Sequence, residues 1–490
     1  MNPPSRRRFL AAAAATGGLR AVAGARPNVL IIYTDEHSWW TLGAYGSRLV
    51  GTPNLDSIAR EGAVFHNYFV NSAVCTPSRG CFITGLYPHT HGAYKNDIEM
   101  RRDAATLAHV LQRNGYETGM AGKWHLDGEP RPGWMSVERS MGFADCRWMY
   151  NRGHWKRIVE RPAGWPRNRS VAKAGNVSYK AEAPDGRPDM DYDVQAEGQF
   201  FTDWIAGKAI EFLQRKRDQP FFYYLSIPDP HTPLTVGPPY DTMYRPAEMP
   251  VPSSLYQKNL PDWAERIRGQ YVRQEGSSSW DDPKREKILR QRKAQYCGMV
   301  KCIDDNVGRI LKALREGDLL DHTLIVFSSD HGQYMGEHGL YMKNALYETA
   351  HRVPMLMRWP SVVRAGTSLR QCVASVDVVP TILGLLGLKA PAAVQGHDAS
   401  PLVRGEPANW KDEAFIHHSS LDFAGIFTPD WQLIWPRNGE RVLFDRRNDP
   451  DQIRNLYRSP AHKAVVGELT ERVIAHNREV EAPAAQWLSR

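Results

Sequence analysis

The chain is poor in cysteine, has no long apolar run and carries only a small excess of positive charge. Its six cysteines form none of the paired C-x-x-C clusters that are typical of zinc sites. No stretch approaches the roughly 18 consecutive apolar residues of a membrane-spanning helix, so we do not expect the protein to span a membrane. With 490 residues, of which 42% are hydrophobic and 24% charged, it is not a disordered chain, a collagen-like fibre or a small disulfide scaffold.

The net charge of +8 comes partly from the first residues. Residues 1–25 contain four arginines and no acidic residue, so the rest of the chain carries +4. A net charge this small does not indicate a nucleic-acid partner, and the sequence has no basic stripe interleaved with aromatic residues.

The same first residues resemble an export signal. Ser5-Arg6-Arg7-Arg8-Phe9-Leu10 is a twin-arginine pattern, an alanine run follows at 11–15, and Ala23-Gly24-Ala25 offers a cleavage site. We expect residues 1–25 to be recognised by the twin-arginine export machinery, which carries folded proteins, so that the mature chain is periplasmic or secreted. A disordered basic tail is the alternative.

The pattern after residue 26 predicts an α/β fold. Apolar, β-branched runs at 28–33, 118–123, 221–227, 324–328 and 353–359 are typical of buried strands, and helical patterns at 53–60, 106–113 and 302–314 separate them. We therefore expect a large mixed, mostly parallel sheet sandwiched by helices over residues 26–398. Residues 150–200 and 235–285 lack periodicity and are expected to be long functional insertions.

The pattern of predicted strands and helices changes near residue 399. Short strands are expected at 414–417, 431–435 and 441–445, followed by a helix near 460–478. We predict a small C-terminal α+β domain with an antiparallel sheet at 399–490.

Chemically active residues follow the predicted strands of the larger domain. In parallel sheets, ligands bind at the carboxyl ends of the strands. Asp35-Glu36, Lys123, His231 and Asp330-His331 all stand at such ends. Asp35 and Asp330 are hard oxygen donors that suit a divalent cation.

Cys75-Thr76-Pro77-Ser78-Arg79, continued by residues 80–85, resembles the signature of the type I sulfatase family. These are formylglycine-dependent, arylsulfatase-like enzymes of the alkaline phosphatase superfamily. Further motifs follow the family's order: Thr52 to Asp56, Gly122 to His125, Pro230 to Pro233, Ser329 to Gly332, Lys343 to Glu348, and Leu443 to Leu456. The resemblance covers essentially the whole mature chain, so residues 26–398 would be the sulfatase catalytic domain.

The resemblance implies that a formylglycine-generating enzyme oxidises Cys75 to formylglycine, whose aldehyde is hydrated to a geminal diol. That chemistry suits a sulfate ester, which needs a nucleophile and gathered positive charge. A thiolate would leave a sulfated sulfur that needs a second nucleophile. In a diol, one oxygen attacks sulfur and the other expels sulfate. An inert, buried cysteine is the alternative.

The expected site follows from these motifs. Arg79, one turn after Cys75 if the segment opens a helix, would brace the diol or the metal-side carboxylates. Lys123 and His125, at i and i+2, would present two donors to sulfate. A histidine would protonate the leaving alcohol. The expected catalytic residues are Cys75, Arg79, Lys123, His125, His231 and Lys343, and the expected metal ligands are Asp35, Glu36, Cys75, Asp330 and His331.

The resemblance implies Ca²⁺ as the metal, with Mn²⁺ or Mg²⁺ as alternatives. Two residues depart from the family pattern: Glu36 stands where a second Asp is common, and His331 where Asn is common. Imidazole suits Mn²⁺ or Zn²⁺ better than Ca²⁺.

Other residues have two interpretations. Asn96 would contact the substrate or belong to a loop. Tryptophans expected in loops would stack on the leaving group or pack there: Trp39, Trp40, Trp148, Trp155 and Trp165. Four histidines are interpreted as structural or surface residues: His91, His109, His154 and His397.

Together these features predict an exported sulfatase that hydrolyses the sulfate ester of a small molecule or carbohydrate. One alternative is a phosphonate monoester or phosphodiester hydrolase of the same superfamily; Glu36 and His331 favour it, and Lys123 with His125 disfavours it. The other is a non-catalytic binding protein with the sulfatase fold.

Overall fold

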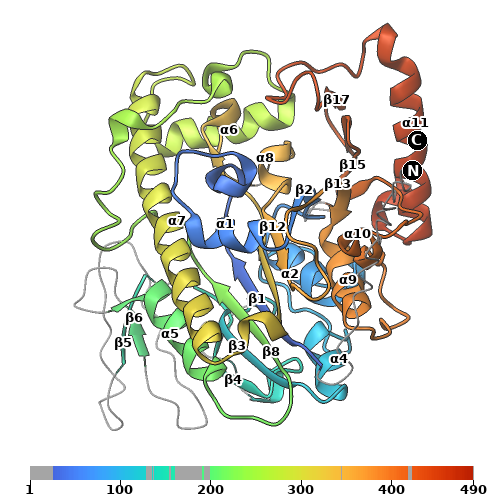
Figure 1. Cartoon of the computed structure of the whole chain (residues 1–490). Helices are drawn as coiled ribbons and strands as arrows, with labels where there is room; N and C mark the ends of the chain where they lie inside the picture. The colour runs from blue at the N-terminus through green and yellow to red at the C-terminus, as the bar shows by residue number, and fades with distance from the viewer. Residues whose placement is uncertain are drawn as a thin grey trace, which may run out of the picture.

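The computed structural model of the chain describes residues 26–128, 135, 137–153, 156–160, 190–192, 199–343, 345–417 and 422–488 (Figure 1). The predicted export signal at 1–25 lies outside these residues, as do His154, Trp155, Trp165 and most of the predicted insertion at 150–200. All six cysteines are described, and all six are buried.

The large domain is built on an eight-stranded sheet. In spatial order the strands are β13 (Thr367–Ala374), β2 (Ala63–Phe69), β12 (Met355–Arg358), β9 (Thr323–Ser329), β1 (Asn28–Thr34), β8 (Phe221–Ile227), β3 (Glu117–Lys123) and β4 (Asp145–Tyr150). Neighbouring strands run parallel except at β12, which is antiparallel to both of its neighbours. The predicted mixed, mostly parallel sheet is confirmed.

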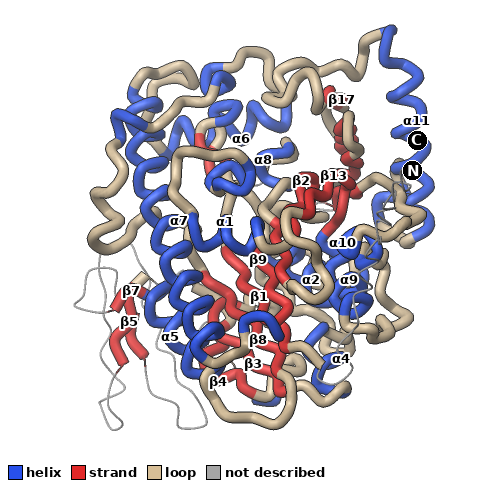
Figure 2. Tube along the Cα trace, in the orientation of Figure 1, coloured by secondary structure: helices blue, strands red, loops and turns tan. Residues whose placement is uncertain are grey.

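Helices cover both faces of this sheet because alternate residues of its strands point to opposite sides. In β1, Val29 and Ile31 join one hydrophobic core, and Leu30 and Ile32 join the other. Figures 1 and 2 show α5 and α7 on the left and α2, α4 and α9 on the right. The helices of the first core are α2 (Cys75–Thr84), α4 (Leu107–Arg113) and α9 (Val378–Leu385), and those of the second are α1 (Pro53–Arg60), α5 (Phe201–Leu213) and α7 (Lys284–Glu316).

A second, antiparallel sheet lies near the C-terminus, as predicted. Its four strands are β14 (Ala414–His417), β15 (Phe423–Phe427), β16 (Trp431–Pro436) and β17 (Val442–Asp445), and α11 (Lys463–Glu479) packs on one face. The other face joins the large domain, where the rings of Phe69 and Phe427 stack with centroids 4.2 Å apart. The domain boundary near residue 399 stays a prediction.

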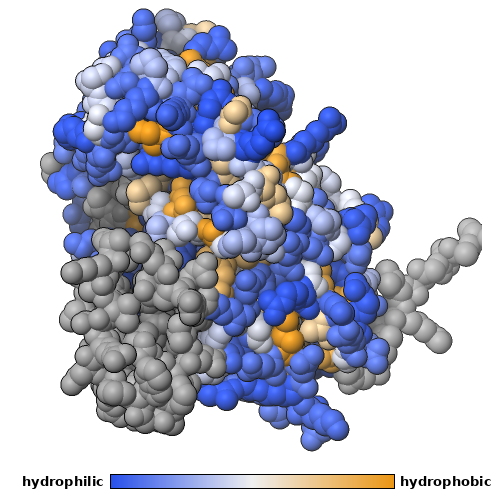
Figure 3. All heavy atoms as spheres, turned by 90° about the vertical axis from the view of Figure 1, so that its left-hand side faces the viewer, coloured by the Kyte–Doolittle hydropathy of each residue, from blue (hydrophilic) through white to orange (hydrophobic). Residues whose placement is uncertain are grey.

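The remaining described α-helices and strands are short, apart from α6. They are α3 (Pro88–His91), α6 (Asp262–Gln274), α8 (Glu348–His351), α10 (Ser400–Arg404), β5 (Arg157–Glu160), β6 (Met190–Tyr192), β7 (Gln199–Phe200), β10 (Tyr334–Met335) and β11 (Tyr341–Met342). None of the helices in the described part of the chain is long and apolar enough to cross a bilayer. The face in Figure 3 is largely hydrophilic, with apolar side chains in small groups.

Two expectations about local structure were wrong, and one helix is longer than expected. The region 235–285 contains α6, a mostly polar helix that buries Trp263, Ala264 and Arg268. The predicted helix at 302–314 is confirmed, but it is the last part of the longer helix α7, whose first half is rich in Lys and Arg and packs on a separate core. Trp148 lies in strand β4, where its ring meets that of Trp204 edge-on at 5.3 Å.

Candidate active site

Helix α2 brings Cys75 to the carboxyl edge of the central sheet. All ten residues of α2 are buried, and the helix ends at Gly85, whose φ of 71° is readily adopted by glycine. Two bonds hold its first turn: Thr76 Oγ1 donates to the His125 carbonyl at 2.9 Å, and the Thr76 N–H donates to Asn96 Oδ1 at 3.0 Å. Asn96 therefore satisfies a backbone donor at the start of the helix.

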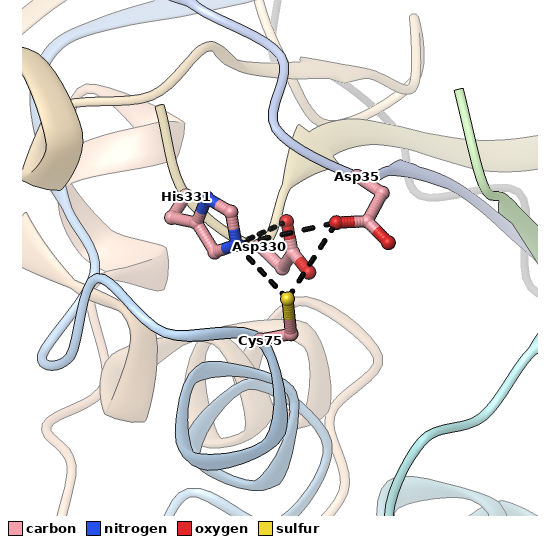
Figure 4. A group of neighbouring side chains, drawn as sticks. All are labelled: Asp35, Cys75, Asp330 and His331. Carbon is pink, nitrogen blue, oxygen red and sulfur yellow. Dashed lines mark hydrogen bonds and ion pairs between the residues drawn. The ribbon is translucent and has the colours of Figure 1, made fainter. Parts of the chain in front are cut away.

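The Cys75 sulfur is surrounded by groups from three other segments, and Figure 4 shows Asp35, Asp330 and His331 beside it. It lies 3.2 Å from His331 Nε2, 3.8 Å from Asp35 Oδ1 and 3.1 Å from Lys343 Nζ. Only 1% of Cys75 is exposed.

Asp35 and Asp330 meet because the strands that carry them are neighbours. β1 and β9 pair in register up to Thr34 and Ser329, so the next residue of each strand emerges at the same edge. The Asp330 N–H donates to the Thr34 carbonyl at 3.1 Å, and Asp330 Oδ1 accepts from the Glu36 N–H at 3.0 Å. Both carboxylates are fully buried.

Arg79 braces these two carboxylates. Its Nε donates to Asp330 Oδ2 at 3.0 Å, and its Nη2 lies 3.3 Å from Asp35 Oδ2. Nη1 donates to the Lys123 carbonyl at 3.0 Å and to Ser226 Oγ at 2.8 Å. Burial lowers the pKa of the guanidinium, but the two aspartates raise it above its ordinary value, so the side chain stays charged.

The strand geometry that the i and i+2 spacing of Lys123 and His125 assumed does not extend to His125. β3 ends at Lys123, and His125 has a φ of 61°, so the alternation of side chains stops before it. Lys123 Nζ donates to Asp35 Oδ2 at 2.5 Å. His125 Nε2 lies 3.9 Å from Asp97 Oδ1.

Glu36, His231 and Lys343 form a second buried group against Cys75. Lys343 Nζ donates to Glu36 Oε1 and, at 2.9 Å, to His231 Nε2, which lies 3.3 Å from Glu36 Oε1. Burial and the Lys343 ammonium hold the pKa of His231 well below its usual range. Burial lowers the pKa of Lys343, but Cys75 and Glu36 raise it above its ordinary value. A charged lysine therefore donates to a neutral imidazole.

His331 turns one ring nitrogen toward the site. Its Nδ1 lies 2.9 Å from the Gly332 carbonyl, which leaves Nε2 facing Cys75 and, at 3.6 Å, Asp330 Oδ1. Burial lowers the pKa of this imidazole, but Asp330 and Cys75 raise it, to about 9.

These side chains fit a divalent cation. One ligand atom each from Asp35, Cys75, Asp330 and His331 lies within 4.8 Å of the others. Glu36 was expected among the ligands, but it lies outside this group because its Oε1 pairs with Lys343. Its other oxygen, Oε2, is buried without a hydrogen-bond partner among the described residues, and such an orphaned carboxylate oxygen fits a neighbouring cation.

The tryptophans and histidines with open interpretations, where the structure describes them, contact other residues of the chain. The Arg352 guanidinium lies 4.0 Å from the centre of the Trp39 ring, and Trp40 lies 5.8 Å from the Tyr296 ring. His91 Nε2 lies 3.2 Å from the Pro77 carbonyl, and His109 caps α4. The His397 N–H donates to Asp377 at 2.8 Å. These contacts agree with the structural interpretation of the histidines.

Sequence reasoning missed a group directly behind the site, consisting of Lys156, Thr202 and Asp229. All three side chains are buried. Asp229 could have been noticed, because it follows strand β8 as Asp35 follows β1. Nothing in the pattern around Lys156 distinguishes it from a surface lysine.

Comparison with known proteins agrees with this geometry. The sulfatase family model matches residues 27–388, and the model for the C-terminal part of N-sulphoglucosamine sulphohydrolase matches residues 336–479. An N-acetylglucosamine-6-O-sulfatase of Bacteroides thetaiotaomicron is 28% identical over 88% of this chain and 83% of its own. The multifunctional alkaline phosphatase superfamily protein PehA of Trinickia caryophylli is 28% identical over 92% of this chain and 95% of its own.

Among solved structures, the phosphonate monoester hydrolase of Agrobacterium radiobacter has the same fold. It superposes with a TM-score of 0.74 at 24% identity and covers 94% of this chain and 97% of its own.

Proposed function

The chain belongs to the sulfatase family, and from that premise we propose that it hydrolyses the sulfate ester of a carbohydrate or small molecule to an alcohol and inorganic sulfate. The observation that carries this proposal is the position of Cys75. It starts a buried helix and faces two carboxylates, an imidazole and an ammonium group at once. The relative named for N-acetylglucosamine 6-O-sulfate chemistry supports a sulfated sugar as substrate.

We assign the nucleophile to position 75. In the proposed active enzyme the Cys75 sulfur stands in for the oxygens of formylglycine, made by a formylglycine-generating enzyme. Once hydrated, that residue supplies an oxygen nucleophile that can later release sulfate. Lys343 Nζ and His331 Nε2, at 3.1 and 3.2 Å from the sulfur, are placed to hydrogen-bond to such oxygens.

Asp35, Asp330 and His331 would hold the metal, with Glu36 Oε2 as a further oxygen donor beside them. We propose Ca²⁺, as the family resemblance implies, with Mn²⁺ or Mg²⁺ as alternatives. Two carboxylates suit any of these cations, and the imidazole favours Mn²⁺. When bound, the cation supplies positive charge to a sulfate oxygen and lowers the pKa of the nucleophile. Arg79 and Lys123 orient the carboxylates for it.

His231 and Lys343 would deliver the proton to the leaving group. The S–O bond to the alcohol oxygen breaks, that oxygen takes a proton, and water ultimately supplies the new oxygen of sulfate. The proton comes from the charged Lys343, whose Nζ lies 2.9 Å from His231 Nε2, and the neutral imidazole orients this ammonium toward the leaving oxygen. His125, at the edge of the site, would bind the substrate's sulfate with Lys123.

We also propose that the protein is exported by the twin-arginine route after Cys75 has been oxidised in the cytoplasm. The burial of all of α2 supports this order, because a modifying enzyme could not reach Cys75 in the folded chain. Detection of the modification only in exported protein would contradict it.

Turnover of nitrophenyl sulfate, phosphate and phosphonate esters tests the activity. We expect the sulfate ester to be the best substrate and Cys75→Ala to abolish its hydrolysis, whereas the buried Cys297→Ala on α7 should retain it. A preference for phosphonate esters would indicate that this protein is instead a phosphonate monoester hydrolase, as the Agrobacterium enzyme with the same fold is named. Full hydrolysis by Cys75→Ala would refute the proposal.

A further inference from the structure

A buried ion pair lies directly behind the histidine of the site. Lys156 Nζ donates to Asp229 Oδ1 and, at 2.8 Å, to the backbone carbonyl of His231. Thr202 Oγ1 donates to the other Asp229 oxygen, Oδ2, at 2.5 Å. Lys156 is 1% exposed, and Asp229 and Thr202 are 0% exposed.

This group connects three segments that are distant in sequence. Lys156 precedes β5, Thr202 lies in the first turn of α5, and Asp229 stands between β8 and His231. The Lys156 carbonyl accepts from the Phe201 N–H at 2.8 Å, which ties the lysine to the start of α5. The Asp229 carbonyl accepts from the Asp35 N–H at 3.2 Å, so the same residue touches the backbone of a metal-side aspartate.

The directions of these bonds give the lysine a specific effect. Its ammonium has no acceptor role and places separate N–H donors on the Asp229 side chain and on the His231 carbonyl. The Lys156 ammonium thereby holds both neighbours of Pro230 in place, Asp229 through its side chain and His231 through its carbonyl. Because the His231 ring must keep Nε2 at 2.9 Å from Lys343 Nζ, any rotation of this backbone moves the ring out of that contact.

We propose that Lys156 is a positioning residue for leaving-group protonation. Its side chain contacts the backbone of His231 and not the ring, and it acts by holding the His231 loop through Asp229 and the His231 carbonyl. This inference rests on the proposed function, in which the hydrogen-bonded pair of His231 and Lys343 protonates the leaving oxygen.

The test compares two kinds of sulfate ester. Nitrophenolate leaves readily without a proton, whereas an alkoxide or sugar oxygen needs one. We expect Lys156→Met to lower kcat by about tenfold or more for an alkyl sulfate or glucosamine 6-sulfate, and by less than about threefold for nitrophenyl sulfate, with KM changed little. An equal loss for both kinds of ester, or no loss for either, would overturn the inference.

Two further variants separate positioning from folding. Lys293→Met removes another buried lysine, whose Nζ donates to the Pro250 carbonyl at 3.0 Å, and should show no selective loss. If Lys156→Met does not fold, Thr202→Val removes one donor to Asp229 while keeping the side-chain shape, and should show the same selectivity in milder form. Equal effects of Thr202→Val on both esters would overturn the inference.

The outcome also distinguishes this inference from the proposed function. A wild-type enzyme that hydrolyses no sulfate ester would refute both. An active wild-type enzyme whose Lys156→Met variant is unimpaired would refute only the role of Lys156.

Discussion

The Lys343 ammonium lies 3.1 Å from the Cys75 sulfur, although the two residues are 268 positions apart in the chain. Lys343 follows β11, and Cys75 begins α2. Their contact places a fixed positive charge where the oxygen of a reacting sulfate ester would carry developing negative charge. Such preorganised charge is typically the largest single contribution to catalysis.

Arg79 should not be replaceable by lysine. Only the planar guanidinium can reach Asp35 and Asp330 together while also bonding to Ser226. We expect Arg79→Lys to lower kcat for nitrophenyl sulfate about 100-fold and to weaken Mn²⁺ or Ca²⁺ binding about tenfold in titration calorimetry.

The matched control for that variant is Arg358→Lys. Arg358 is also buried and also bridges two carboxylates, those of Glu61 and Asp321, of which Asp321 precedes strand β9 whereas Asp330 follows it. Equal metal affinity and kcat in the two variants would argue against the bracing role of Arg79.

Removal of the metal should abolish turnover and lower thermal stability. A cation that binds the folded protein only, at 100 times its Kd, stabilises that protein by about 2.7 kcal/mol. We expect the Tm of EDTA-treated protein to rise when Ca²⁺, Mn²⁺ or Mg²⁺ is restored, and Asp330→Asn to lose this rise. A Tm that responds to none of the three ions would contradict the assignment of the metal site.

Glu348 should make stability depend on pH. Burial raises the pKa of this carboxyl, but Arg446 and Arg352 lower it, from an ordinary value of 4.5 to about 2. A depressed pKa stabilises the folded state above the unfolded value, and this contribution is lost as the pH falls from about 4.5 toward 2. The contribution at neutral pH is about 3 kcal/mol.

The measurement is the Tm of wild type and Glu348→Gln between pH 2 and 7. We expect the variant to be less stable at neutral pH and the two curves to converge in acid. Parallel curves over the whole range would show that the ion pair with Arg446, which follows β17, does not stabilise the fold through its charge.

The sequence was most informative where chemistry and periodicity coincide. Buried apolar strands predict parallel pairing, and pairing brings their final residues together, so Asp35 and Asp330 could be expected to meet. Strands β2, β13 and β15 escaped detection, in part because β2 and β13 alternate buried with half-exposed or exposed positions and have no continuous apolar run.

Contacts between distant loops could not be predicted in the same way. Glu36 was expected to bind the metal, yet its Oε1 pairs with Lys343, whose position depends on the fold of the segment after β11. His125 follows a strand, but its positive φ breaks the alternation that the spacing assumed. Nothing in the sequence around Lys156 indicates that its side chain contacts the His231 backbone, and only the structure reveals this contact.

The central claim concerns the chemical state of residue 75, and mass spectrometry tests it most directly. Trypsin releases residues 61–79 as one peptide from protein purified from its native host. We predict an aldehyde in place of the Cys75 thiol in a major fraction of this peptide, which should react with a hydrazide probe and resist alkylation by iodoacetamide. A peptide that is always alkylated as a thiol, from protein that nevertheless hydrolyses sulfate esters, would contradict the account.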